Sequence, residues 1–192
     1  MYRKYLVHKK SMEDRAAALG GQSGNPVERW LFHGTPQEAI QNINRYGFNR
    51  SYSGLNGLLI GHFPHTCLCF HFVLLTESND SFYWQDLLDS PSSILYSLAT
   101  LYGNGVYFAI QAAPSAQDQF ASPNPDGMKH IYYARVLVGD FAQGSQGMLY
   151  PPPRNNNRAD KYDSVTDNPA GPNMFIIFYN TQAYPDYLIE FK

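Results

Sequence analysis

The sequence predicts a single α+β domain built mainly from antiparallel strands, with few helices. Two observations predict this class. The apolar runs are short and rich in aromatic and β-branched residues, the clearest being Ile131–Val138, and long loops separate them. The length of 192 residues suits one domain, and a hydrophobic content of 44% is enough for a substantial core.

Charge and cysteine usage limit the function classes. The net charge is −2 and lysines and arginines form no block, so nothing favours direct binding to nucleic acid. The start of the chain lacks the apolar core of a secretion signal, and no apolar run is long enough to span a bilayer. The only cysteines, Cys67 and Cys69, are spaced poorly for a disulfide within the chain. We therefore expect an intracellular protein, of nucleus or cytoplasm, without a membrane partner.

The N-terminal part predicts a helix followed by a linker. Tyr2–Ala18 is polar with few apolar positions, and we expect a helix there. The glycine-rich stretch that ends at Pro26 is a flexible break. We therefore expect residues 1–27 to be a partial N-terminal helix and linker, and residues 28–192 to be the main domain.

A second helix should begin directly after a short strand at Arg29–Phe32. Thr35 is a favourable N-cap residue, and Pro36 suits the first helical position. Glu38 follows Thr35 by three residues, which is the spacing of a capping box.

The same helix has a predicted buried face and a predicted end. Ile40 and Ile43 lie on one side of it, and Gly47 is a typical C-terminal stop. Gly34 then lies at the corner between strand and helix. Because Gly34 has no Cβ, a flat polar ligand could lie against its main chain.

The rest of the chain alternates short strands with loops. Gly103–Phe108 is a turn that enters a strand, and Pro114–Phe120 can form a short helix. Prolines and asparagines dominate residues 151–160, where we expect loop or linker structure. The later strands are expected at Ile131–Val138, Met174–Tyr179 and Tyr187–Phe191.

Residues 57–98 differ from the rest of the chain and are interpreted as an atypical insertion. This block contains both cysteines and the apolar run Leu68–Leu75. A zinc site is one hypothesis, since imidazole and thiolate are zinc ligands, but the spacing fits no established motif and we expect no metal. The candidate ligands are His62, His65, Cys67, Cys69 and His71.

Seven motifs follow one another along the chain in a recognisable order. They are LFHGT (Leu31–Thr35), YGFNRSYSGLN (Tyr46–Asn56), YGNGVYFA (Tyr102–Ala109), KHIYYARVLVGDF (Lys129–Phe141), YPPP (Tyr150–Pro153), YDSVTDN (Tyr162–Asn168) and FYNTQAYPDYLIEF (Phe178–Phe191). Together they resemble the catalytic domain of poly(ADP-ribose) polymerases, most closely the macrodomain-linked, mono-ADP-ribosylating branch. The resemblance implies an ADP-ribosyltransferase fold with mainly antiparallel split sheets, and NAD as co-substrate.

The resemblance also implies roles for individual residues. His33 matches the family histidine that hydrogen-bonds a ribose hydroxyl of NAD, and Gly34 matches the glycine whose main chain pairs with the nicotinamide amide. Tyr107 matches the tyrosine on one side of the nicotinamide pocket, so the rings of His33 and Tyr107 should border one slot. Ser115 matches the serine that hydrogen-bonds the carboxamide. Phe120 takes the place of the second stacking aromatic and keeps the π face without the usual hydroxyl.

Met174 occupies the third position of the family's catalytic triad, after His33 and Tyr107. Polymer-forming members have a glutamate there, whereas methionine cannot polarise a ribose hydroxyl or act as a base. The resemblance therefore implies transfer of one ADP-ribose unit to a protein side chain, with release of nicotinamide and assistance from the acceptor's own carboxylate. Glu190 lies on a later strand and does not match this position.

Plainer explanations exist for the same residue types. Tyr107 and Phe120 could be core aromatics, and Ser115 could be a polar residue in the first turn of a helix. Asp163 and Asp167 would form a carboxylate pair in one interpretation, but their polar loop predicts that both are solvated.

Two departures from the family pattern support a second functional hypothesis. The insertion at 57–98 interrupts the region where a loop over NAD belongs. An earlier strand and helix of the family domain have no counterpart here, which would leave an open sheet edge. The alternative function is therefore a catalytically inactive binding or interaction module with the same fold.

Overall fold

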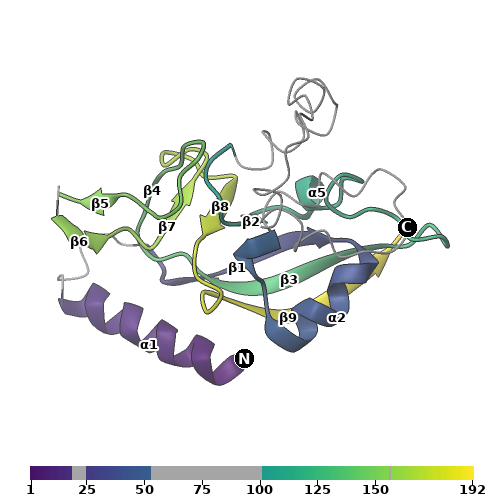
Figure 1. Cartoon of the computed structure of the whole chain (residues 1–192), viewed down its shortest axis with the longest axis horizontal. Helices are drawn as coiled ribbons and strands as arrows, with labels where there is room; N and C mark the ends of the chain where they lie inside the picture. The colour runs from purple at the N-terminus through teal and green to yellow at the C-terminus, as the bar shows by residue number, and fades with distance from the viewer. Residues whose placement is uncertain (19–24, 53–100, 156) are drawn as a thin grey trace, which may run out of the picture.

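The computed structural model describes residues 1–18, 25–52, 101–155 and 157–192, so the predicted insertion at 57–98 and its candidate zinc ligands lie outside the described residues. Figure 1 shows the arrangement of the elements. In chain order they are α1 (Tyr2–Ala18), β1 (Glu28–Thr35), α2 (Gln37–Tyr46), the short 3₁₀ helix η1 (Arg50–Tyr52), β2 (Val106–Ala109), α5 (Ala112–Ser115), β3 (Lys129–Leu137), β4 (Phe141–Gln143), β5 (Pro153–Arg154), β6 (Asn157–Lys161), β7 (Ser164–Thr166), β8 (Met174–Ile177) and β9 (Ala183–Phe191).

The central element is a seven-stranded sheet with strand order β4-β7-β8-β2-β1-β3-β9 (Figure 1). Neighbouring strands are antiparallel, except for the parallel pair of β4 and β7. β5 and β6 form a separate two-stranded sheet. The predicted α+β class with mainly antiparallel strands and few helices is confirmed.

Strand lengths depart from the predicted ones where tertiary contacts decide them. β1 continues to Thr35 because Gly34 and Thr35 still pair with β3. β9 begins at Ala183, four residues before the predicted start, because its first residues also pair with β3. β8 ends at Ile177 rather than Tyr179. The chain turns there because the backbone N–H groups of Phe178 and Tyr179 donate to the Oε1 atom of Gln182.

The capping box predicted for α2 is wrong. Thr35 is fully buried as the last residue of β1, and Pro36 is the N-cap without a side-chain capping bond. Thr35 therefore pairs within the sheet, although the local sequence predicts that it caps the helix. The predicted stop is confirmed: Gly47 has φ of +83°, and its N–H donates to the carbonyl of Ile43 over 2.8 Å.

Two further predictions need correction. The predicted helix at Pro114–Phe120 begins at Ala112 and ends at Ser115, so Ser115 is the last residue of the helix rather than its second. The predicted loop at residues 151–160 contains strands β5 and most of β6. Asn155, at φ of +48°, reverses the chain between them, a conformation that asparagine tolerates better than most residues.

The two faces of the sheet are covered differently. On one face, Ile43 of α2 and Phe48 join Leu31, Phe108 and neighbouring residues in the largest buried cluster. Helix α5, by contrast with α2, packs on strands β1 and β2. α1 packs at the end where β1 begins: the hydroxyl of Tyr5 donates to Glu28 over 2.5 Å. None of the helices in the described part of the chain is long and apolar enough to cross a membrane.

β9 pairs with β3 and forms one edge of the described sheet. Its side chains Tyr187, Leu188 and Ile189 are 60%, 42% and 38% exposed. The open edge that the sequence predicts from missing family elements stays a prediction.

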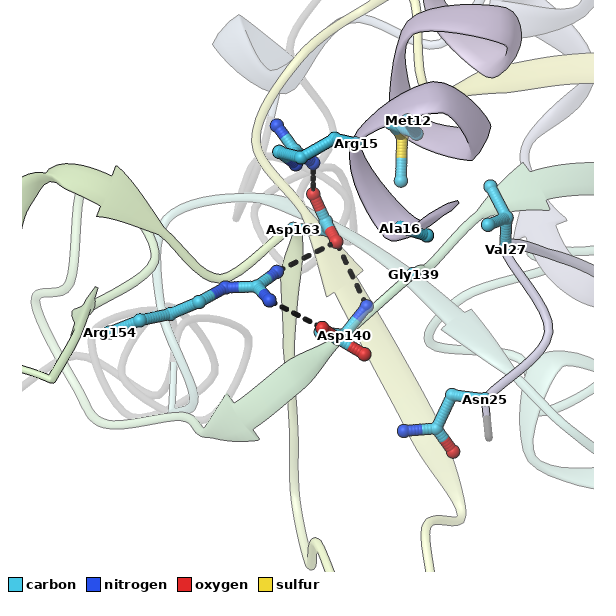
Figure 2. A pocket seen from close by; sticks show the side chains of 9 residues that line it. All are labelled: Met12, Arg15, Ala16, Asn25, Val27, Gly139, Asp140, Arg154 and Asp163. Atoms are coloured by element: carbon cyan, nitrogen blue, oxygen red, sulfur yellow. Dashed lines mark hydrogen bonds and ion pairs between the residues drawn. The ribbon is translucent and has the colours of Figure 1, made fainter. Parts of the chain in front are cut away.

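A cluster of charged side chains joins α1 to the sheet, and Figure 2 shows it at close range. We call it the Asp163 hub; it comprises Arg15, Asp140, Arg154 and Asp163. The carboxylate of Asp163 lies between the guanidinium groups of Arg15 and Arg154 and also accepts the backbone N–H of Asp140 over 2.9 Å. Arg154 forms a second ion pair with Asp140. The prediction that Asp163 is solvated is wrong, because its side chain is only 10% exposed.

Candidate functional site

His33 and Tyr107 are joined through the main chain of Tyr107. The Nδ1 atom of His33 on β1 lies 2.9 Å from the carbonyl oxygen of Tyr107 on β2. A carbonyl oxygen can only accept a hydrogen bond, so Nδ1 carries the hydrogen. In the neutral imidazole Nε2 is then left as an acceptor.

Burial favours that neutral form. The ring of His33 packs against Phe48 and Phe108, with centroid distances of 5.1 and 5.3 Å. Loss of hydration lowers the pKa of His33 below its ordinary value, against a smaller opposing effect of the hydrogen bond to Tyr107. Near neutral pH the ring therefore presents a lone pair at Nε2.

The rings of His33 and Tyr107 leave the sheet on opposite faces. Phe32 pairs with Ala109, so the side chains of Phe32, Ala109 and Tyr107 share one face, and His33 shares the other with Phe108. The ring of Tyr107 packs against the cluster of Val165, Ile176 and Phe178, away from the aromatic neighbours of His33. That both rings border one slot stays a prediction.

Gly34, Ser115 and Phe120 lie in direct contact. A Cβ on Gly34 would lie 2.8 Å from the Cβ of Phe120 and nearer still to the carbonyl oxygen of Ser115. The hydroxyl of Ser115 donates to the carbonyl of Phe32 over 3.1 Å. Only glycine therefore allows β1 and α5 to approach this closely.

The main chain of Gly34 faces the same way as that of Phe32. Residues two apart along a strand direct their N–H and C=O groups to the same side. Since Ser115 binds the carbonyl of Phe32, the polar groups of Gly34 also point toward α5 and β2. An amide placed beside Gly34 would find one donor and one acceptor there.

Phe120 and Met174 complete the predicted set. Phe120 is 39% exposed, which leaves its ring accessible beside Gly34. Met174 begins β8 opposite Ala109 and packs, like Tyr107, against the cluster of Val165, Ile176 and Phe178. No carboxylate takes part at this position, because the side chain is a thioether.

Phe48 is not among the predicted site residues, although it is 2% exposed and its ring contacts that of His33 edge-on. The signal was its place in the motif YGFNRSYSGLN, directly after the glycine that ends α2. A contact between a strand and the segment that follows the next helix has no local signature.

Relatives found by sequence comparison extend over the whole site. Protein mono-ADP-ribosyltransferase PARP14 of Homo sapiens is 36% identical over 193 residues, which cover 100% of this chain and 8% of the relative. The chain is a PARP catalytic domain of the mono-ADP-ribosyltransferase branch. Protein mono-ADP-ribosyltransferase PARP10 of Mus musculus is 36% identical, covering 87% of this chain and 13% of the relative. Protein mono-ADP-ribosyltransferase PARP12 of Mus musculus is 38% identical, covering 86% of this chain and 17% of the relative.

This PARP domain spans less than a fifth of the length of those three relatives. No protein-family model matches the chain. The names of the three relatives describe transferases, so they do not favour the alternative of an inactive interaction module.

Proposed function

We propose that this PARP domain is an NAD-dependent mono-ADP-ribosyltransferase that moves one ADP-ribose unit from NAD to a protein side chain and releases nicotinamide. The observation that carries the proposal is the contact of Gly34 with Ser115 and Phe120 next to the His33–Tyr107 hydrogen bond. These residues match the family positions for NAD, and the similarity to mono-ADP-ribosyltransferases covers the whole chain.

In this proposal the nicotinamide ring lies beside Gly34. The main-chain N–H of Gly34 donates to the carboxamide oxygen, and its C=O accepts from the carboxamide nitrogen. Phe120 offers a ring face for stacking. The Ser115 hydroxyl already donates to Phe32, so it offers the carboxamide an acceptor lone pair unless it rotates.

His33 binds the ribose rather than the nicotinamide. Its Nε2 lone pair accepts a ribose hydroxyl, a role that the hydrogen bond from Nδ1 to Tyr107 makes possible. In the reaction the bond between C1′ and the pyridinium nitrogen breaks, its electron pair leaves with neutral nicotinamide, and an acceptor oxygen forms the new bond to C1′. Binding the nicotinamide ring and the ribose in fixed positions lowers the entropic part of the activation barrier.

Met174 limits the reaction to one unit. Extension of a chain requires activation of a ribose hydroxyl as the next acceptor, and a thioether neither accepts a proton nor polarises the hydroxyl at neutral pH. A carboxylate acceptor is already ionised near pH 7 and needs no base, so acidic side chains of proteins are the proposed acceptors.

The proposal includes an intracellular location, in the nucleus or cytoplasm, which the cysteine spacing supports. The absence of direct nucleic-acid binding stays a prediction from the charge pattern.

Incubation with labelled NAD tests the activity. We expect single-unit labelling of the chain or an added acidic protein, with nicotinamide release, and no labelling by His33→Ala. Tyr187→Phe is a suitable control because Tyr187 is 60% exposed on β9. Equal labelling by His33→Ala would contradict the assignment, and absence of nicotinamide binding by the folded wild-type chain would favour the inactive alternative.

A further inference from the structure

The hydroxyl of Tyr107 is fully engaged within the chain. It donates to the carbonyl of Gly103 over 2.9 Å and accepts the backbone N–H of Tyr102 over 3.0 Å. A hydroxyl has one proton to donate, and here that proton is committed to Gly103. Burial raises the pKa of Tyr107 to about 12, so the proton is retained throughout the physiological range.

The turn that this hydroxyl binds is closely packed on its other sides. A Cβ on Gly103 would lie 3.0 Å from the ring of Phe178 and 3.2 Å from the carbonyl of Met148. The N–H of Asn104 donates to that same carbonyl over 2.8 Å. The turn that the Tyr107 hydroxyl binds is therefore also packed against Phe178 and Met148.

Tyr107 thus makes polar contacts through both its backbone carbonyl and its side-chain hydroxyl. Its carbonyl orients the imidazole of His33, and its hydroxyl binds the turn before β2. With the main chain held in β2 and the hydroxyl held at the turn, the ring between them has a fixed orientation. Phenylalanine would fill the same space without either hydroxyl bond, so the hydroxyl adds fixation of the ring to its packing.

From this geometry we infer that the Tyr107 hydroxyl is a positioning group, which binds the Tyr102–Gly103 turn and fixes the ring, and that only the ring face meets the nicotinamide end of NAD. The inference rests on the proposed function and deepens it, because it separates two roles within one predicted site residue. The hydroxyl takes no part in the transfer step.

Tyr107→Phe tests this inference, with Tyr187→Phe as the matched control. Phenylalanine keeps the ring but leaves the N–H of Tyr102 without its acceptor. We expect KM for NAD to rise about fivefold, with kcat within about twofold of wild type, as for a loss of ground-state binding. Tyr187→Phe should change neither constant.

Amide hydrogen exchange provides a readout that is independent of activity. In the wild type the N–H of Tyr102 should exchange slowly although it lies in a turn, and in Tyr107→Phe it should exchange about tenfold faster or more. Rapid exchange at Tyr102 in the wild type would overturn the inference without any variant, as would unchanged exchange in Tyr107→Phe.

The kinetic outcomes are equally decisive. A kcat that falls about tenfold with KM unchanged would place the hydroxyl in the chemistry and overturn the inference. Faster exchange of the Tyr102 amide with both KM and kcat unchanged would also overturn the inference, since NAD binding would then not depend on the hydroxyl fixing the ring. If the wild type binds nicotinamide but transfers nothing, the proposed function fails, whereas exchange at Tyr102 still decides whether the hydroxyl binds the turn.

Discussion

The candidate site and the Asp163 hub hold their side chains in different ways. In the site, His33, Ser115 and Tyr107 each bond to a main-chain carbonyl. In the hub, arginines and carboxylates bond to one another. Main-chain partners are fixed by the sheet and uncharged, so they set geometry with little dependence on salt. The hub instead joins separate elements through charges, and its strength depends on burial and protonation.

Each region contains a glycine at a very close contact, so the contacts of both regions can be disrupted by substituting glycine with alanine. Gly34 lets α5 approach β1 in the site, and Gly139 lets the carboxylate of Asp163 approach the end of β3 in the hub. Alanine at either position adds one methyl group, but only at Gly139 does the methyl group also meet a left-handed backbone conformation.

Gly139→Ala should have the largest effect on stability. Its φ is +50°, and its Cβ would lie 2.8 Å from the Cε of Met12 and nearer still to the Oδ2 of Asp163. The left-handed conformation and the displaced hub together should lower the free energy of unfolding by about 3 kcal/mol. Urea denaturation measures this, and transfer activity per folded molecule should be unchanged.

Gly171→Ala is the control for this experiment, because the nearest atom to its Cβ would be 3.9 Å away. It should change stability by less than about 0.5 kcal/mol. A loss for Gly139→Ala as small as the control's would contradict both expected costs, the left-handed backbone and the displaced hub.

Gly34→Ala should have a smaller effect on stability and a larger one on ligand binding. The methyl group must separate β1 from Ser115 and Phe120, at a cost of about 2 kcal/mol. Nicotinamide affinity, measured by calorimetry, should fall about tenfold or more because the main chain of Gly34 shifts. Unchanged affinity in a folded variant would remove Gly34 from the nicotinamide site.

Stability should respond to pH with opposite signs in the two regions. Burial lowers the pKa of His33, so below about pH 6.5 the unfolded chain binds a proton that the folded chain resists, and stability falls as pH falls. Burial raises the pKa of Asp163 above 3.8, against the opposing effects of Arg15 and Arg154. Between 3.8 and that raised pKa the folded chain holds the extra proton, so this contribution to stability falls as pH rises.

Denaturation of wild type and His33→Asn at about pH 5 and about pH 7 isolates the contribution of His33 to the pH dependence of stability. The wild type should lose more stability on acidification than the variant does. His8 has a lowered pKa for the same reason, but it is present in both proteins and cancels in the difference. Equal losses in the two proteins would mean that His33 is protonated in the folded state.

The same contrast separates what the sequence predicts from what it does not. His33, Gly34 and Tyr107 could be proposed as site residues because they lie in motifs whose order along the chain resembles the family's, and their roles stay predictions. Asp163 was predicted to be solvated because its polar loop has no local sign of burial. Its partner Arg15 lies 148 residues away in the sequence, a separation over which local patterns carry no information.

Helix α2 shows the same limit on a smaller scale. Thr35 and Glu38 have capping-box spacing, yet pairing of Thr35 with His130 extends β1 and moves the helix start to Gln37. The stop at Gly47 was predictable because a positive φ is an intrinsic preference of glycine, independent of tertiary partners. Intrinsic backbone preferences therefore survive in the fold, whereas side-chain capping yields to sheet pairing.

Arg15→Ala should give the smallest effect and tests how far the hub depends on solvent-exposed charge. The side chain of Arg15 is 43% exposed, whereas Asp163 is 10% exposed and keeps Arg154 as a partner. We expect a loss of less than about 1 kcal/mol, smaller still at about 0.5 M salt, because water and ions screen an exposed guanidinium. Lys10→Ala, which removes an ion pair with Asp14 that is exposed on both sides, is the control and should change less. A salt-independent loss above about 2 kcal/mol for Arg15→Ala would mean that α1 is fixed by a buried charge, and the two regions would then differ less than their contacts indicate.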